Sequence, residues 1–184
     1  MGKIFIISGP SGAGEDSIIN GLEKIMPIER IITTTTREKR IGETEGRPYY
    51  FISREEFIRR RDEGGFFEWA EQYNSNLYGV TFEEIERIKK SKNIGIWKIE
   101  YKGVIAAKKL MPDIVSIFVN CPINQLAERI KKRDGISDEY LAERMAYTEE
   151  WLRHTDVYKF SVNNENGKLE EAVKEAAELI LHNL

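Results

Sequence analysis

The sequence predicts an α/β fold, a mostly parallel sheet covered by helices on both faces, and three observations lead to this prediction. Apolar runs such as IFII at 4–7 and IVSIFV at 114–119 are typical of strands buried on both faces. After residue 82, strand-like runs alternate with amphipathic helical patterns. A glycine-rich turn joins the first apolar run to the first helical pattern, which is a common opening of α/β domains.

The periodicity of the sequence indicates each element in turn. Apolar residues at helical spacing predict helices at 17–26, 55–64, 82–93, 104–111, 123–133, 137–154 (capped by Ser137 or Asp138) and 168–184. Short apolar or threonine-rich runs predict strands at 31–36, 48–53, 93–101, 113–120 and 158–164, and a strand with a loop at 66–79. The polar, aromatic section from about 33 to 82 differs from the rest and is predicted to be an insert on the main sheet.

Composition limits the classes of function. The 184 residues fit one compact domain, and the net charge of -3 gives no global basic surface for nonspecific nucleic-acid binding. The first apolar run is too short for a signal peptide or a membrane span. The single cysteine, Cys121, excludes an internal disulfide framework and fits a reducing cytosol. We therefore expect a cytoplasmic monomer or homodimer that binds neither nucleic acid nor membrane.

The turn after the first strand is close to a phosphate-binding loop. Residues 7–19 read ISGPSGAGEDSII, against the pattern G-x-x-x-x-G-K-[ST]. Gly9 and Gly14 have the required spacing, but Glu15 occupies the lysine position and Asp16 the hydroxyl position. The glycines let backbone N–H groups converge, and the start of the following helix favours anions. The alternative is a simple turn with an acidic helix start, since carboxylates are favourable in a first turn.

A second motif, TTTTREKRIGETEGRPYYF at 33–51, places two arginines close to tyrosines. Arg37 and Arg40 lie three residues apart, behind a row of threonines and ahead of a glycine-containing turn. Two guanidinium groups and a phenol can hold a phosphate dianion from several sides. The alternative interpretation is a solvated basic turn.

As a set, these motifs resemble those of guanylate kinases, P-loop enzymes that transfer the γ-phosphoryl group of ATP to GMP. The resemblance covers essentially the whole chain and rests on SGPSGAG, TTTTREKRIGETEGRPYYF, FFEWAE, LYG, MPD before a strand, the arginines of AERIKKR, and VNN. It implies a P-loop NTPase-type three-layer fold with a parallel-sheet core, a small mixed GMP-binding insert and a helical lid. The implied boundaries are 1–32, 83–126 and 155–184 for the core, 33–82 for the insert and 127–154 for the lid.

The resemblance also implies roles for individual residues. The loop for the ATP phosphates would comprise Gly9, Ser11, Gly12, Ala13, Gly14, Glu15, Asp16 and Ser17. The GMP site would comprise Thr33, Arg37, Arg40, Tyr49, Glu68, Tyr78 and Glu100. Glu68 fits guanine because a carboxylate accepts hydrogen bonds from the paired N1 and N2 donors, which adenine lacks.

Further roles follow for the lid and the adenine side. Arg129, Arg133 and Arg144 would be lid arginines that neutralise charge on the transferring phosphoryl group. Asn163 would lie near adenine. Taken alone, the three arginines could equally be helix-surface residues that bridge to glutamates.

Three segments depart from the family pattern. The loop reads GAGEDS where the family has GAGKST, so two carboxylates replace a lysine and a hydroxyl. The family segment D-x-D-x-Q-G reads KIEYKG at 98–103, which puts Lys98 at the first aspartate, Glu100 at the second and Lys102 at the glutamine. Val80 occupies a site that usually carries a small hydroxyl residue.

The first two departures suggest an exchange of charge, because this strand lies beside the loop in P-loop folds. Either Glu15 pairs with Lys98, or Lys98 reaches the phosphates in place of the missing lysine and acts in catalysis. Asp16 could offer a carboxylate oxygen to the Mg²⁺ that accompanies ATP. Without compensation, the lysine-to-glutamate change opposes the developing negative charge and slows transfer.

Three functions remain open. The first is a kinase that uses ATP–Mg²⁺ and GMP, which the GMP-site residues and lid arginines favour. The second is a catalytically weak or inactive module that binds GMP or a protein partner, which Glu15, Asp16 and Lys98 favour. The third is an enzyme like ribose 1,5-bisphosphate phosphokinases, which share the fold and resemble the YGV stretch. Glu68 and TTREKR favour GMP, so the sequence predicts a guanylate kinase.

Overall fold

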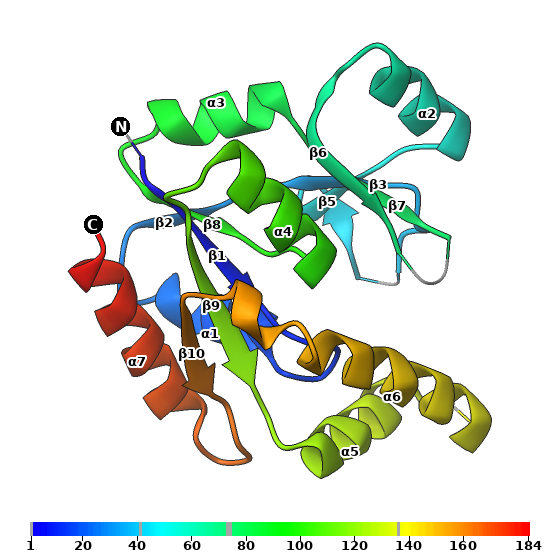
Figure 1. The fold of residues 1–184 in the computed structure, drawn as a ribbon, viewed down its shortest axis with the longest axis vertical. Helices are drawn as coiled ribbons and strands as arrows, with labels where there is room; N and C mark the ends of the chain where they lie inside the picture. Colours follow the sequence, from blue (N-terminus) through cyan, green and yellow to red (C-terminus); the bar gives the residue numbers. More distant parts are fainter. Residues whose placement is uncertain (1, 41, 73–74, 136) are drawn as a thin grey trace.

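Two sheets organise the chain in the computed structural model, which describes residues 2–40, 42–72, 75–135 and 137–184 without the side chains of 133 and 134. The first sheet contains β1 (Ile4–Ser8), β2 (Ile28–Arg30), β8 (Ile94–Trp97), β9 (Val115–Asn120) and β10 (Phe160–Asn163). Its strands are all parallel, in the order β10-β9-β1-β8-β2 (Figure 1).

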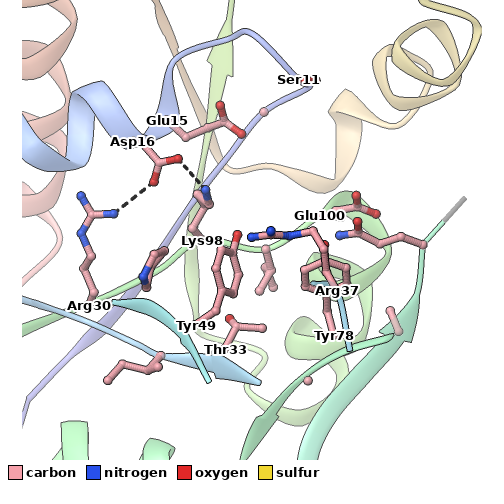
Figure 2. A pocket seen from close by; sticks show the side chains of 18 of the residues that line it. Ser11, Glu15, Asp16, Arg30, Thr33, Arg37, Tyr49, Tyr78, Lys98 and Glu100 are labelled. Atoms are coloured by element: carbon pink, nitrogen blue, oxygen red, sulfur yellow. Dashed lines mark hydrogen bonds and ion pairs between the residues drawn. The ribbon is translucent and has the colours of Figure 1, made fainter. Parts of the chain in front are cut away.

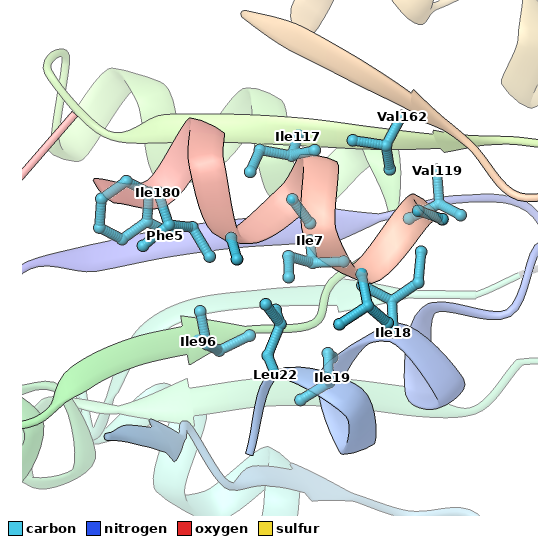
Figure 3. Close-up of a cluster of buried hydrophobic side chains, with 14 of the residues drawn as sticks. Phe5, Ile7, Ile18, Ile19, Leu22, Ile96, Ile117, Val119, Val162 and Ile180 are labelled. Carbon is cyan, nitrogen blue, oxygen red and sulfur yellow. The ribbon is translucent and has the colours of Figure 1, made fainter. Parts of the chain in front are cut away.

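Helices cover both faces of this parallel sheet, as the apolar runs predict. Phe5 and Ile7 of β1 point to a face covered by α1 (Glu15–Leu22) and α7 (Leu169–His182), shown in Figure 3. Ile4 and Ile6 point to the other face, where α3 (Phe82–Lys90) and α4 (Tyr101–Leu110) pack. Because both faces are buried, the strand carries apolar residues at every position instead of every second one.

The second sheet is mixed and carries the threonine row. It contains β3 (Thr33–Thr35), β4 (Thr44–Glu45), β5 (Pro48–Phe51), β6 (Phe66–Glu71) and β7 (Leu77–Thr81), in the order β4-β5-β3-β7-β6. In register, Thr33 lies beside Tyr49 of β5, and Thr35 lies beside Tyr78 of β7. The helix α2 (Arg54–Asp62) closes this sheet through a small apolar cluster.

Two helices lie beyond the carboxyl ends of the parallel strands (Figure 1). They are α5 (Ile123–Asp134) and α6 (Asp138–Leu152), and the short 3₁₀ helix η1 (Thr155–Val157) leads from them back to the sheet. Ser137 caps α6 by accepting a hydrogen bond from the backbone N–H of Tyr140. At the other end of α6, Trp151 is buried against Tyr101 and Phe118, which anchors the helix to the sheet side.

Most predicted elements agree with the structure, with differences at their ends. Two strands were not predicted, β7 in the segment expected to end as a loop and the short β4 in a segment expected to be a turn. The strand predicted at 93–101 ends at Trp97, and α4 already begins at Tyr101, so residues 98–100 form a connection. The helix predicted at 17–26 begins at Glu15 and ends at Leu22. Residues 28–30 form an edge strand that the sequence analysis missed, because three residues are too few for a periodic signal. Among the described residues, no helix is long and apolar enough to cross a membrane.

Candidate functional site

The loop between β1 and α1 keeps the backbone of an anion site. Gly12 and Gly14 have positive φ values of 87° and 94°, which residues with a side chain rarely adopt. A Cβ at Gly9 would lie 2.7 Å from the carbonyl oxygen of Val119, so only glycine fits against β9. These glycines set the start of α1, with its positive dipole end, at the mouth of a cavity.

The Glu15 side chain folds back onto this loop. Its Oε2 accepts a hydrogen bond from the backbone N–H of Gly14, 3.1 Å away. Burial raises the pKa of the Glu15 carboxyl to about 7, against the opposing effect of Lys98. A carboxyl group of the protein therefore takes one of the loop amides that a bound anion could use.

Lys98 pairs with Asp16, so the predicted pairing with Glu15 is wrong. Its Nζ lies 2.7 Å from Oδ2 of Asp16, and Nη1 of Arg30 lies 3.1 Å from Oδ1 of the same carboxylate (Figure 2). Between described residues, no ion pair joins Lys98 and Glu15. The physical reason is that Glu15 turns back to the Gly14 amide, while Asp16 faces Arg30 at the end of β2 and Lys98 directly after β8.

Lys98 lies between the loop and the second sheet. Besides its contact with Asp16, its Nζ is 5.9 Å from the centre of the Tyr49 ring (Figure 2). Burial opposes the charge of Lys98, but Tyr49, Asp16 and Glu15 outweigh it and raise the pKa of the ammonium group. The group is therefore a cation at neutral pH.

Arg37, Arg40, Tyr49 and Tyr78 form what we call the arginine–tyrosine cluster. The Arg37 guanidinium lies 5.3 Å from the Tyr49 ring, and the Tyr49 and Tyr78 rings meet edge to face at 6.0 Å. Arg40 is exposed and lines the same cavity. The structure thus brings together two guanidinium groups and two phenols from β5, β7 and the turn after β3.

Glu43 belongs beside this cluster, and the sequence analysis missed it. Its two carboxylate oxygens accept hydrogen bonds from Nη2 of Arg37 at 2.7 and 3.0 Å, and Oε2 also accepts from the backbone N–H of Arg40. The signal in the sequence is its position in the same turn, three residues after Arg40. Glu43 holds the Arg37 guanidinium in a fixed orientation.

Glu68 and Glu100, which both line the cavity, form a carboxylate pair. Glu68 is only 7% exposed. This burial, together with the nearby Glu100, raises the pKa of Glu68 to about 7. Burial raises the pKa of Glu100 to about 6, although the Tyr147 hydroxyl donates to its Oε2 at 2.7 Å. Thr33 is buried and lines the same cavity. The pair is an acceptor-rich surface for a ligand that offers N–H donors.

One cavity of about 810 Å³ joins these parts. The residues predicted for the site that line it are Gly9, Ser11, Glu15, Asp16, Thr33, Arg37, Arg40, Tyr49, Glu68, Tyr78, Lys98, Glu100 and Arg144. A cavity of this size suits ligands as large as nucleotides. Its lining combines the glycine-rich loop, the arginine–tyrosine cluster and the carboxylate pair.

Comparisons with known proteins agree with this arrangement. The family model described as guanylate kinase matches residues 1–183. The chain belongs to the guanylate kinase family. It is 37% identical to a guanylate kinase of Symbiobacterium thermophilum over 98% of this chain and 85% of that one. It is 35% identical to one of Rubrobacter xylanophilus over 97% of this chain and 93% of that one.

A solved guanylate kinase confirms the predicted fold class. The crystal structure of guanylate kinase from Anaplasma phagocytophilum superposes with a TM-score of 0.79 at 26% sequence identity. The match covers 98% of this chain and 85% of that chain. The α/β architecture with a parallel sheet core is thus shared with a family member whose sequence has diverged widely.

The arginines predicted for the lid of this guanylate kinase relative lie in different surroundings. Arg144, on α6, lines the main cavity, and its Nη2 donates a hydrogen bond to Oγ of Ser11 at 2.6 Å. Arg129, on α5, instead donates to the carbonyl oxygens of Gly12 and Asn164 and lines a second cavity of about 460 Å³. Arg133 lies on α5, and its side chain is outside the described residues.

The second cavity lies on the outer side of the loop. Gly12, Gly14, Ser17 and Asn164 line it. The buried Asn164 donates to the carbonyl oxygen of Ala13 at 2.6 Å and so fixes the loop to the end of β10. The predicted Asn163 lies one residue earlier and accepts a hydrogen bond from Asn120 at 2.9 Å. The buried contact to the loop is thus made by Asn164.

The fit of a metal to Asp16 is poor in this arrangement. Each of its two oxygens already faces a cation, Lys98 on one side and Arg30 on the other. Within the described ranges, no group of three or more histidine, cysteine, aspartate or glutamate residues could hold a metal ion. A divalent cation on Asp16 would be repelled by both partners, so we assign no metal site to the protein itself.

Proposed function

We propose that this protein transfers the γ-phosphoryl group of ATP to GMP, giving ADP and GDP. The observation that carries the proposal is the single cavity that the phosphate-type loop, the arginine–tyrosine cluster and the carboxylate pair all line. Membership of the guanylate kinase family supports the same reaction. The alternative acceptor, ribose 1,5-bisphosphate, has no base to match the carboxylate pair.

GMP would bind with its phosphate on the arginine–tyrosine cluster. The Arg37 guanidinium, which lines the cavity and which Glu43 holds in place, would donate charge-assisted hydrogen bonds to this phosphate. Its guanine would lie against Glu68 and Glu100, with Thr33 beside them. Binding would require ionised Glu68, since only an ionised carboxylate accepts both guanine N–H groups without offering a competing donor.

ATP would approach from the loop side, with adenine near the second cavity. Family members use a divalent cation with ATP, and Mg²⁺ would arrive here bound to the phosphates, where it would neutralise part of their charge. Ser11 and the loop amides would contact the donor phosphates, and Arg144 would reach them from α6. Residues 33–82 and 127–154 would close over the two nucleotides to exclude water.

A catalytically weak GMP-binding module is the second possibility, and a specific contact favours it. Glu15 holds a loop amide and adds negative charge where donor phosphates would lie. In that case the arginine–tyrosine cluster and the carboxylate pair would still bind GMP.

An ADP-release assay with ATP, Mg²⁺ and GMP separates these functions. AMP, ribose 1,5-bisphosphate and a mixture without acceptor serve as the comparison reactions. The proposal predicts release of ADP that depends on GMP and formation of GDP in equal amount. GMP binding by calorimetry without ADP release would establish the binding module, and release with ribose 1,5-bisphosphate alone would establish the third function.

A further inference from the structure

The phosphate-binding end of the cavity lacks the cation that its loop normally supplies. At the position of the loop lysine stands Glu15, followed by Asp16. Phosphoryl transfer depends on electrostatic stabilisation of charge on the transferred group. If the protein is a kinase, this cation must come from another element.

Lys98 is better placed for this role than Arg30, which also lies at Asp16. Arg30 is held through all three guanidinium nitrogens, by Glu23 at 2.7 Å, Asp16 at 3.1 Å and Asn20 at 2.5 Å. The ammonium group of Lys98 has three donors, and its described hydrogen bond to Asp16 uses one of them. Its side chain is 26% exposed and lines the main cavity.

The position of Lys98 matches the junction of two phosphates. On one side lies the start of α1, reached through Asp16 at 2.7 Å. On the other side lies the Tyr49 ring at 5.9 Å, which itself carries the Arg37 guanidinium at 5.3 Å. Figure 2 shows Lys98 between these two groups. A donor phosphate at the loop and an acceptor phosphate at Arg37 would therefore meet next to its Nζ.

We infer that Lys98, the first residue after β8, supplies the cation for the transferring phosphoryl group, and that Asp16 is the positioning residue that holds it there. This inference rests on the proposed function. In the reaction, the bond between the γ-phosphorus and the β–γ bridging oxygen of ATP breaks. The bond between that phosphorus and a phosphate oxygen of GMP forms, and ADP leaves with the electron pair. Lys98 neutralises charge throughout and keeps its protons.

The anchoring of Asp16 explains how a long side chain can serve as a fixed cation. Lysine has four rotatable bonds, so an unrestrained ammonium group would lose much rotamer freedom when it met phosphate. Asp16 restrains it, and Arg30 in turn restrains Asp16 from β2. In this arrangement the carboxylate that replaced a hydroxyl of the usual loop holds the cation that replaced its lysine.

The test compares Lys98→Met with a matched variant, Lys89→Met. Lys89 also pairs with a carboxylate, Glu86 at 3.0 Å, and its side chain is 33% exposed, but it lies on α3 and does not line the main cavity. We expect Lys98→Met to lower kcat about 100-fold or more, with GMP affinity within about twofold of wild type. Lys89→Met should leave both unchanged. Thermal unfolding of each variant reports whether the fold persists.

A rescue experiment separates a phosphate contact from a structural role. Glu15→Lys restores a lysine to the loop. The double variant Glu15→Lys/Lys98→Met should therefore have a kcat about tenfold or more above that of Lys98→Met alone. Asp16→Asn should raise the KM for ATP and lower kcat less than Lys98→Met does, because the cation remains but is less fixed. Equal activity of Lys98→Met and wild type, or a loss in both lysine variants alike, would overturn the inference, as would failure of rescue in a folded double variant.

The proposed function and this inference fail in different ways. Wild-type protein that releases no ADP with GMP contradicts the proposed function. Calorimetric titration with ATP then still shows whether Lys98 contacts the ATP phosphates. Such a contact predicts a loss of ATP affinity of about tenfold or more in Lys98→Met and no loss in Lys89→Met. Equal ATP affinities of the two variants would overturn the inference in that case as well.

Discussion

Two parts of the main cavity, the arginine–tyrosine cluster and the loop between β1 and α1, differ in which groups form the site. In the arginine–tyrosine cluster, the side chains themselves form the site, and every member predicted from the sequence lines one cavity. At the loop, the backbone keeps the geometry of an anion site, while the side chains of Glu15 and Asp16 are carboxyl groups and not cations. If Lys98 supplies the missing cation as inferred above, backbone amides and the cation are separable parts of a phosphate site, and the cation comes from the connection that follows β8.

The largest expected effect is at the arginine–tyrosine cluster. Arg37→Met should lower kcat/KM for GMP about 100- to 1000-fold, because the GMP phosphate loses a guanidinium partner that Glu43 holds in place. Arg61→Met is the control, since Arg61 also pairs with a carboxylate and lies 5.1 Å from an aromatic ring, yet does not line the cavity. Steady-state kinetics measure both, and equal effects would remove the cluster from the GMP site.

The carboxylate pair should set the choice of base. Glu68→Gln should weaken GMP binding about 30- to 100-fold, because one guanine donor then meets an amide donor. Glu71→Gln on the same strand, exposed and paired with Arg54, should have no effect. Calorimetry measures both affinities, and unchanged GMP binding by Glu68→Gln would place guanine elsewhere.

Glu68 also predicts two opposite pH dependences. Its folded pKa of about 7 lies above the ordinary glutamate value of 4.5, so the folded protein binds a proton more readily than the unfolded chain does. The free energy of unfolding therefore gains most from this group below about pH 4.5 and loses that gain as the pH rises through 7. GMP affinity should change the other way and increase from about pH 6 to about pH 8. Glu68→Gln should reduce the slope of both profiles, as measured by denaturant titration and calorimetry. Glu15 and Glu100, whose pKa values burial raises to about 7 and about 6, should keep part of the slope in stability.

A smaller effect is expected at the loop. Glu15→Gln should lower the KM for ATP about three- to tenfold, because a negative group leaves the start of α1. Glu83→Gln is matched to it, since Glu83 also lies in the first turn of a helix, α3, away from the cavity. A rise in the KM for ATP of Glu15→Gln would show that the carboxylate helps donor binding.

The smallest effect is expected at α6. Tyr147→Phe removes a hydrogen bond to Glu100 and should raise the KM for GMP about three- to fivefold. Tyr101→Phe removes a similar bond, to Glu150 at 2.6 Å, but outside the cavity lining, so it should not change the KM. Equal kinetics of both variants would separate α6 from the GMP site.

The fold and the charged side chains of the arginine–tyrosine cluster and the carboxylate pair were predictable because their signals are local. Apolar runs specified the buried strands, and TTTTREKR and FFEWAE specified the arginines and the buried carboxylate. The pairing of Lys98 with Asp16 instead of Glu15 was not predictable, because it depends on which way two adjacent side chains turn at the start of α1. Tyr147 was also missed, although Arg144, Tyr147, Thr148 and Trp151 share one helix face at three- and four-residue spacing.

The most direct test of the separated loop and cation is a crystal structure with a bisubstrate analogue, adenosine and guanosine joined by five phosphates. The account predicts Nζ of Lys98 at about 3 Å from an oxygen of a central phosphate, with Arg37 on the phosphate next to guanosine. It would be contradicted if Lys98 remained bound to Asp16 alone while the phosphates lay on the loop amides without it.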